Sequence, residues 1–244
     1  ITLEPLASAN AVLSQEEKEA GVALIDIGGG TTDLAIFKDG IIRHTAVIPF
    51  GGNVITTDIK SGIQILEKQA EMLKIKFGCA MESATKDNVM VSIPGLRGRD
   101  PKEVSVKNLS AIIESRMKEI IELVNHQIIS SGFQNKLMTG IVITGGGSQL
   151  RSLPQLVSYI TGKEVRVGVP NEHLGSESKS KVKSPMFSTG VGLVQKGFEE
   201  VDWKEIQENT PINLEKPEEE PSTIGLKGKF IGFLDNLFSD EELN

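Results

Sequence analysis

The chain has 244 residues, of which 39% are hydrophobic and 25 are glycine, an ordinary globular composition that excludes fully disordered, collagen-like and membrane-spanning chains. A single cysteine, Cys79, excludes an internal disulfide and a cysteine-cluster metal site, and the three histidines lie far apart without ligand spacing. The net charge of −7 resides in residues 199–224, where nine acids face two lysines, so the nearly neutral body predicts no nucleic-acid partner.

Hydrophobic patterning predicts alternating strands and helices in the first half of the chain. Residues 21–38 read as a hairpin that closes at Asp39-Gly40, because an Asp-Gly pair favours the tight turn between antiparallel strands. After it we expect a third strand at 41–50, one helix at 56–77, a strand at 88–93, a loop at 94–105 and a long helix at 105–129.

In the second half of the chain, the hydrophobic pattern predicts a buried strand that ends in three glycines, followed by shorter elements. The expected order is a strand at 141–144, a helix opening at 153, a strand at 165–170, a loop at 172–184 and a helix at 185–198. Residues 199–224 are rich in Glu, Pro and Asn and predict a disordered linker, and helical spacing returns in 225–244. The alternation indicates an α/β fold.

Two glycine-rich loops, about 115 residues apart, are the strongest functional signal. Asp26-Ile27-Gly28-Gly29-Gly30-Thr31-Thr32 follows a strand, and glycines there let backbone N–H groups approach a phosphate closely. Asp26 at the strand end suits a hydrated Mg²⁺. Thr144-Gly145-Gly146-Gly147-Ser148 suits an adenosine packed on bare backbone. The alternative for either loop alone is a simple glycine-rich turn.

The segments DIGGGTTD and TGGGS resemble the phosphate and adenosine motifs of the actin/DnaK/sugar-kinase ATPases, and within that superfamily the chain resembles the FtsA family of bacterial cell-division proteins. The other segments that carry this resemblance are residues 4–13, 24–52, 94–105 and 140–150. It implies the C-terminal half of an actin-like ATPase. A ribonuclease-H-like subdomain 2A would comprise 1–57 and 128–198, with an inserted subdomain 2B at 58–127, a linker at 199–224 and a membrane-targeting helix at 225–244.

The resemblance assigns ATP and Mg²⁺ to the chain, residue by residue. Asp26 would hold Mg²⁺ through water, and the nucleotide would contact Gly28, Gly29, Gly30, Thr31, Thr32, Gly145, Gly146, Gly147 and Ser148. Glu71 and Lys74, one helical turn apart, would bracket the base and ribose; the alternative is an exposed ion pair. Because the family's phosphate-1 half is not in the sequence, we expect the chain alone to bind ATP poorly or not at all, and to have weak ATPase activity at most.

The resemblance also implies partners. Subdomain 2B would bind the acidic C-terminal peptide of FtsZ, with Arg97, Arg99 and Lys102 as candidates, although a solvated basic loop is the alternative. Self-association into actin-like filaments and contacts with later division proteins are expected. The role would be to tether FtsZ filaments at the division septum, as a peripheral protein on the cytoplasmic side of the inner membrane. A sugar-kinase-type phosphotransferase or a DnaK-type chaperone ATPase is the alternative.

The C-terminal segment has one apolar stripe, formed by Phe230, Phe233, Leu234, Leu237 and Phe238. Behind a disordered linker, such a stripe predicts a helix that lies in the headgroup plane of a membrane. The acidic residues within and after the stripe weaken attraction to anionic lipid. The alternative is a helix that docks on the body or on a partner.

Overall fold

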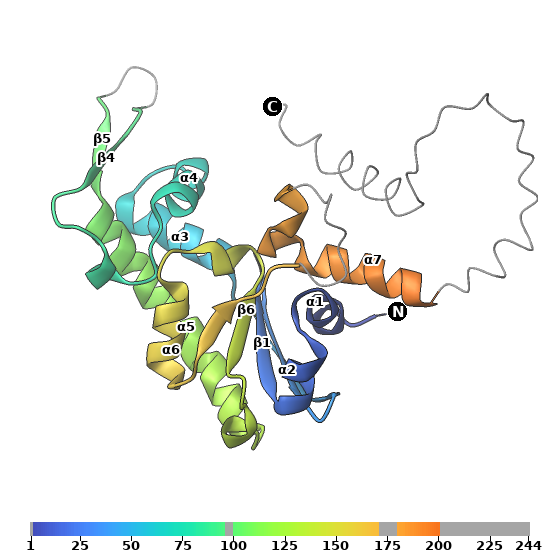
Figure 1. Cartoon of the computed structure of the whole chain (residues 1–244). Helices are drawn as coiled ribbons and strands as arrows, with labels where there is room; N and C mark the ends of the chain where they lie inside the picture. The colour runs from blue at the N-terminus through green and yellow to red at the C-terminus, as the bar shows by residue number, and fades with distance from the viewer. Residues whose placement is uncertain (1, 96–99, 171–179, 201–244) are drawn as a thin grey trace, which may run out of the picture.

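A five-stranded sheet forms the centre of the computed structural model, which describes residues 2–95, 100–170 and 180–200 (Figure 1). The strands are β1 (Val22–Ile27), β2 (Thr32–Lys38), β3 (Ile41–Ile48), β6 (Ile141–Thr144) and β7 (Val165–Val167), in the spatial order β3-β2-β1-β6-β7. The first three form an antiparallel meander, whereas β6 and β7 run parallel to β1. The sheet therefore has an antiparallel half and a parallel half.

The predicted turn between β2 and β3 lies at Asp39 and Gly40, both in the left-handed region with φ of 58° and 75°. Positive φ at both central residues is the geometry that Asp-Gly supplies in a tight hairpin. All six residues of β1 are buried, as expected of a central strand covered on both faces. The strands predicted for the first 50 residues are therefore confirmed.

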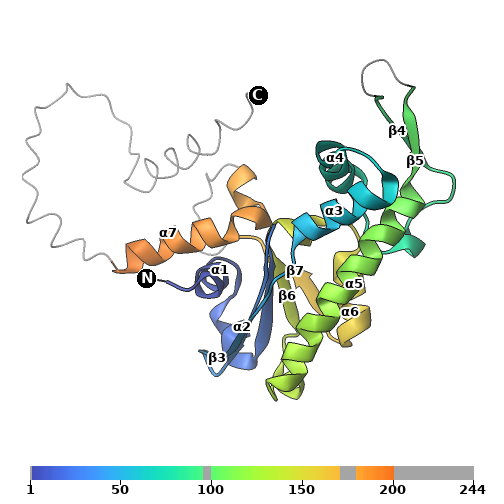
Figure 2. The ribbon, with the colours of Figure 1, turned by 180° about the vertical axis from the view of Figure 1, so that it is seen from behind.

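Helices cover both faces of this sheet, as the two opposite views show (Figures 1 and 2). One face carries α3 (Gly52–Ile63), α5 (Val106–Ser130) and α6 (Leu153–Thr161), and the other carries α1 (Glu4–Val12), α2 (Gln15–Ala20) and α7 (Ser188–Glu200). Strand β1 contributes to both cores: Ile25 and Ile27 face α5, while Leu24 faces α1 and α7. Alternation of side chains along the strand divides the apolar residues into these two layers.

Helices α1 and α7 pack closely although they lie at opposite ends of the described chain. A Cβ at Gly192 of α7 would lie 1.8 Å from the carbonyl oxygen of Ala7 in α1, so only glycine fits this crossing. Neither α1 nor α2 was predicted from the patterning. Helix α2 does carry a local start signal, a capping box in which Ser14 and Glu17 exchange hydrogen bonds.

The single helix predicted at 56–77 is wrong, because the chain forms two helices there. The last residue of helix α3 is Ile63, and Gln64, which caps it, adopts a left-handed φ of 57°. Helix α4 (Glu67–Phe77) begins three residues after Gln64. Apolar residues on both helices keep a helical period, since both pack toward the same core. The periodicity therefore continues across the break, and nothing in it marks the turn.

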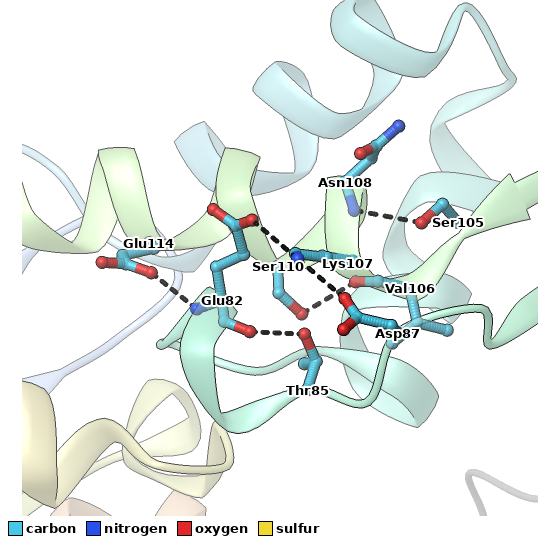
Figure 3. Close-up of polar contacts among 9 residues, drawn as sticks. All are labelled: Glu82, Thr85, Asp87, Ser105, Val106, Lys107, Asn108, Ser110 and Glu114. Carbon is cyan, nitrogen blue, oxygen red and sulfur yellow. Dashed lines mark hydrogen bonds and ion pairs between the residues drawn. The ribbon is translucent and has the colours of Figure 1, made fainter.

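A two-stranded hairpin of β4 (Met90–Ile93) and β5 (Lys102–Ser105) projects from the end of α5 (Figure 1). Four residues of the predicted loop at 94–105 are thus a strand, a correction to that prediction. A short 3₁₀ turn, η1 (Glu82–Ala84), is fastened to α5 by polar contacts (Figure 3). The Glu82 N–H donates to Glu114 at 2.6 Å, and Lys107 pairs with Asp87 at 2.7 Å.

The boundary between the last helix and the predicted linker differs slightly from the prediction. Helix α7 extends to Glu200, so the first two residues of the predicted linker are helical. The rest of that linker and the predicted membrane helix at 225–244 lie outside the described residues. The division into subdomain 2A (1–57 and 128–198) and subdomain 2B (58–127) stays a prediction.

Candidate functional site

The carboxyl ends of β1 and β6 bring the two glycine loops together. Asp26 in β1 pairs with Thr144 in β6 across the parallel ladder and with Asp33 in β2 across the antiparallel one. Since parallel neighbours end at the same edge of a sheet, the loops that follow Asp26 and Thr144 emerge side by side. Segments about 115 residues apart in sequence thus form one surface.

The first loop is fixed by its own backbone and by the start of α3. The Gly28 N–H donates to the Thr31 carbonyl at 2.9 Å and closes a tight turn. The N–H groups of Gly52 and Asn53 donate to the carbonyls of Gly28 and Gly29, at 2.9 and 2.8 Å. These amides at the N-terminus of α3 are therefore occupied, so an anion here would be met by the loop and not by that helix end.

The two threonines of the first loop differ in their roles. Thr32 is fully buried, and its hydroxyl donates to the Phe50 carbonyl at 2.8 Å, which ties β2 to the start of α3. Thr31 is exposed, and its hydroxyl donates to Asp33 at 3.0 Å. Of the predicted pair, only Thr31 presents its side chain at the surface.

The second loop comes into direct contact with Asp26. A Cβ at Gly145, where φ is +82°, would lie 2.3 Å from Oδ1 of Asp26, and one at Gly147 would lie 2.3 Å from Cγ2 of Ile27. Glycine is therefore required for this approach of backbone to strand end. Gly146 is exposed, whereas Ser148 is buried and donates to the Gly145 carbonyl at 2.7 Å. Ser148 thus shapes the loop from within.

Asp26 is a buried carboxylate held by hydroxyls from two helices. Ser8 of α1 donates to Oδ2 of Asp26 at 2.6 Å, and Thr189 of α7 donates to the same oxygen at 3.3 Å. Burial raises the pKa of Asp26 above its usual range; the two hydroxyls act against this, and the charge of Asp33 adds to it. A cation would relieve the cost of this buried charge.

Glu4, at the start of α1, adds a third acidic group to this region. Its pKa is raised by burial first and then by the charges of Asp33 and Asp26. Glu4, Ser8 and Thr189 were not among the predicted site residues. Ser8 and Thr189 are 181 residues apart, and a single polar residue on an otherwise apolar helix face was the only local signal.

Glu71 and Lys74 lie on α4 and bind the start of α3. The Lys74 ammonium contacts Glu71 at 2.7 Å, the Gly52 carbonyl at 2.8 Å and the Thr56 hydroxyl at 2.8 Å, and Thr56 also donates to Glu71. The Lys74 side chain is only 12% exposed, so the alternative of a simple exposed ion pair does not describe it. A cleft of about 370 Å³ opens beside them, lined by Asn53, Thr56, Thr57, Glu67, Lys68 and Glu71.

The other predicted contact residues fall largely outside this surface. Arg97 and Arg99 lie outside the described residues, as do Phe230, Phe233, Leu234, Leu237 and Phe238. Lys102 is exposed on β5, and its ammonium donates to the Ile63 carbonyl at the end of α3. No helix within residues 2–95, 100–170 and 180–200 is long and apolar enough to cross a membrane.

The site offers a metal ion few direct protein ligands. Within the described part of the chain, no three His, Cys, Asp or Glu side chains are grouped to hold a metal ion. The residues present nevertheless fit Mg²⁺ that is bound through water: a buried carboxylate lies against a loop in which Gly145 and Gly147 leave no space for a Cβ. Such an ion would take its other ligands from water and phosphate.

Solved structures with the same arrangement are actin-like proteins. MreB 5 of Spiroplasma citri bound to AMPPNP superposes with a TM-score of 0.61 at 23% identity, over 85% of this chain and 61% of that one. The PilM–PilN type IV pilus biogenesis complex superposes with a TM-score of 0.59 at 19% identity, over 81% and 52%. The predicted actin-like ATPase fold is thereby confirmed for the described residues.

Sequence comparison identifies the family. The family model "Cell division protein FtsA" matches residues 23–192. FtsA of Pseudomonas aeruginosa is 41% identical over 199 residues, covering 82% of this chain and 47% of that protein, and FtsA of Escherichia coli K12 is 37% identical over 201 residues, covering 80% and 47%. The chain thus spans about half the length of the curated relatives it matches. The resemblance read from the glycine loops is confirmed, and the chain belongs to the FtsA family of cell division proteins.

Proposed function

We propose that this chain supplies an ATP-binding wall of a cell-division scaffold that tethers FtsZ filaments to the cytoplasmic membrane. The observation that carries the proposal is the meeting of the two glycine loops at Asp26. That arrangement offers bare backbone to a nucleotide on both sides of one buried carboxylate. The family membership favours this scaffold over a sugar-kinase-type phosphotransferase or a DnaK-type chaperone.

The nucleotide would lie across the sheet edge formed by β1 and β6. Its phosphates would meet the loop of Gly28, Gly29 and Gly30, and its adenosine would pack against Gly145, Gly146 and Gly147. Mg²⁺, held by Asp26 through water, would neutralise phosphate charge there. The likeness to an MreB 5 structure that contains AMPPNP supports nucleotide binding by this fold.

The cleft between α3 and α4 is suited to the ribose and base. Glu71 accepts hydrogen bonds, and Asn53 and Thr57 add donors and acceptors along the cleft wall. Lys74 already contacts Glu71, Gly52 and Thr56, so it fixes the shape of the wall from behind. We propose weak hydrolysis at most.

We place the two partner surfaces in separate parts of the chain. The acidic FtsZ peptide would bind near the β4–β5 hairpin, with Arg97, Arg99 and Lys102 as its cationic contacts. Residues 225–244 would attach the protein to the membrane through the apolar stripe that begins at Phe230. We further propose self-association into actin-like filaments, contacts with later division proteins, and a peripheral position at the septum.

Co-flotation with vesicles tests the tether directly. Vesicles of phosphatidylethanolamine and phosphatidylglycerol are mixed with the chain and with a fluorescent FtsZ C-terminal peptide. We expect the full chain to float and to carry the peptide with it, and the chain lacking 225–244 to remain folded in solution. Arg97→Glu with Arg99→Glu should lose the peptide but still float, whereas the control Lys163→Glu should retain both. Flotation of the truncated chain, or peptide binding unaffected by the double charge reversal, would contradict the proposal.

A nucleotide titration tests the proposed ATP and Mg²⁺ site. Binding of a fluorescent ADP analogue is measured with Mg²⁺ and with excess EDTA, for the chain and for Asp26→Asn. We expect Mg²⁺ to strengthen binding by the unaltered chain, and we expect this increment to disappear in Asp26→Asn. An equal Mg²⁺ increment in both proteins would remove Asp26 from the proposed ion site.

A further inference from the structure

One oxygen of Asp26 is engaged by two hydroxyls that come from separate helices. Ser8 in α1 is fully buried and donates to Oδ2 at 2.6 Å, and Thr189 in α7 lies 3.3 Å from the same atom. The two hydroxyl oxygens also lie 2.9 Å apart, so Thr189 shares its one hydrogen between Ser8 and Oδ2 of Asp26, while Ser8 donates its own to Oδ2. Three elements, α1, β1 and α7, thus meet at a single carboxylate oxygen.

The other oxygen of Asp26 faces the second glycine loop. Oδ1 lies so close to Gly145 that a Cβ there would approach it to 2.3 Å. The carboxylate torsion of an aspartate is broad, so hydrogen bonds decide which oxygen faces which way. With Oδ2 engaged on the side of α1 and α7, Oδ1 is directed toward the loops where the nucleotide would lie.

The Ser8–Thr189 hydrogen bond joins α1 to α7, but most of the packing between these helices comes from other residues. Gly192 brings the backbone of α7 against the Ala7 carbonyl, and Ala9, Ala11, Val12 and Val191 fill the apolar core on that face. A small apolar residue in place of Ser8 would suit this interface equally well. The apolar packing therefore does not require hydroxyls at these two positions, whereas the buried carboxylate of Asp26 does.

We propose that Ser8 and Thr189 are positioning residues for Asp26, which hold its carboxylate so that Oδ1 faces hydrated Mg²⁺ of a bound nucleotide. This inference rests on the proposed nucleotide site. Groups that orient a metal-binding side chain commonly change metal affinity by about 10- to 100-fold when they are removed. The same range is expected here for the Mg²⁺-dependent part of nucleotide binding.

The test compares hydroxyl-deleting variants with matched controls. The test variants are Ser8→Ala and Thr189→Val, and Thr189→Ser preserves the hydroxyl. Ser110→Ala is the control for a buried helix serine, since the Ser110 hydroxyl donates only within α5, to the Val106 carbonyl at 2.9 Å. Each protein is titrated with a fluorescent ADP analogue, once with Mg²⁺ and once with excess EDTA, and its urea unfolding midpoint is measured.

We expect Ser8→Ala to reduce the Mg²⁺-induced gain in affinity by about 10- to 100-fold, with a smaller loss for Thr189→Val. Affinity in EDTA should stay within about threefold, since the effect runs through the ion. Thr189→Ser and Ser110→Ala should behave as the unaltered chain does.

Different outcomes separate this inference from the proposed function. An Mg²⁺ gain in the unaltered chain that Ser8→Ala and Thr189→Val leave intact would overturn the inference alone. A crystal structure of Ser8→Ala adds a readout without nucleotide: we expect the Asp26 carboxylate to rotate, and an unchanged orientation would also overturn it. No Mg²⁺ gain in the unaltered chain would refute the nucleotide site and the inference with it.

Discussion

Adding one methyl group at Gly145 tests whether the second glycine loop lies against Asp26. Its φ of +82° lies in the region that L-residues avoid, and an added Cβ would lie 2.3 Å from Oδ1 of Asp26 and 2.6 Å from the Ile27 carbonyl oxygen. Gly145→Ala therefore combines backbone strain with a steric overlap against a buried strand end.

The expected cost is the sum of these two effects. With ψ at 173°, Gly145 adopts an extended positive-φ conformation that is essentially confined to glycine and costs an alanine about 1–3 kcal/mol. Forcing an extra carbon into a filled space costs about 1–3 kcal/mol. The free energy of unfolding should thus fall by roughly 2–6 kcal/mol. Since about 1 kcal/mol shifts the melting temperature of a domain of this size by about 2–4 °C, Tm should fall by roughly 4–24 °C.

Two other glycines separate the contributions. At Gly162, φ is +66° but nothing lies within 4 Å of an added Cβ, so Gly162→Ala should show the strain alone, about 1 kcal/mol. At Gly30 there is neither a positive φ nor a neighbour within 4 Å, so Gly30→Ala should stay within about 0.5 kcal/mol of the unaltered chain.

Urea unfolding followed by circular dichroism measures all three variants under identical conditions. The order of stability should be Gly30→Ala, then Gly162→Ala, then Gly145→Ala as the least stable. If Gly145→Ala were no less stable than Gly162→Ala, the second loop would not lie against Asp26. The geometry of the candidate site would then be wrong.

Two further predictions concern charge. Because burial and the charge of Asp33 raise the pKa of Asp26, its ionised form costs stability at pH 7, and that cost vanishes as the pH falls through the folded-state pKa toward the usual 3.8. Asp26→Asn should therefore unfold at higher urea than the unaltered chain at pH 7 and converge with it near pH 4; lower stability at pH 7 would contradict this. Burial raises the pKa of Glu17, but hydrogen bonds from Arg166 and Ser14 and the charge of Arg166 lower it overall, so this carboxylate stabilises the fold above its usual pKa of 4.5. Glu17→Gln should cost about 1 kcal/mol at pH 7, and the difference should disappear as the pH falls below that value; a pH-independent difference would mean that the Arg166 pair is not its source.

Local rules accounted for much of the fold and for the loops of the candidate site. The Asp39-Gly40 turn follows from the backbone preferences of two adjacent residues, and the buried strands follow from short apolar runs. The two glycine loops were likewise visible because a run of glycines after an apolar strand is rare and has few uses. Their joint presence led to the family that the comparisons confirm.

The break at Gln64 shows where such rules fail. Both flanking helices present apolar residues to one core, so their periodicity continues through the turn, and a left-handed glutamine carries no sequence signal of its own. Lys74 shows a second limit. Its spacing from Glu71 suggested a surface pair, whereas packing of α4 on α3 buries its ammonium among a carbonyl, a hydroxyl and a carboxylate.

The sequence by itself determined the class of fold, the family and the two loops that would face a nucleotide. Only the tertiary structure decided that Ser8 and Thr189, 181 residues apart, meet at one oxygen of Asp26. The physical reason is that a hydroxyl on an apolar helix face has no local partner that reveals its role. Its partner depends on how α1 and α7 cross over the end of β1. That crossing results from the packing of all the apolar residues on this face of the sheet.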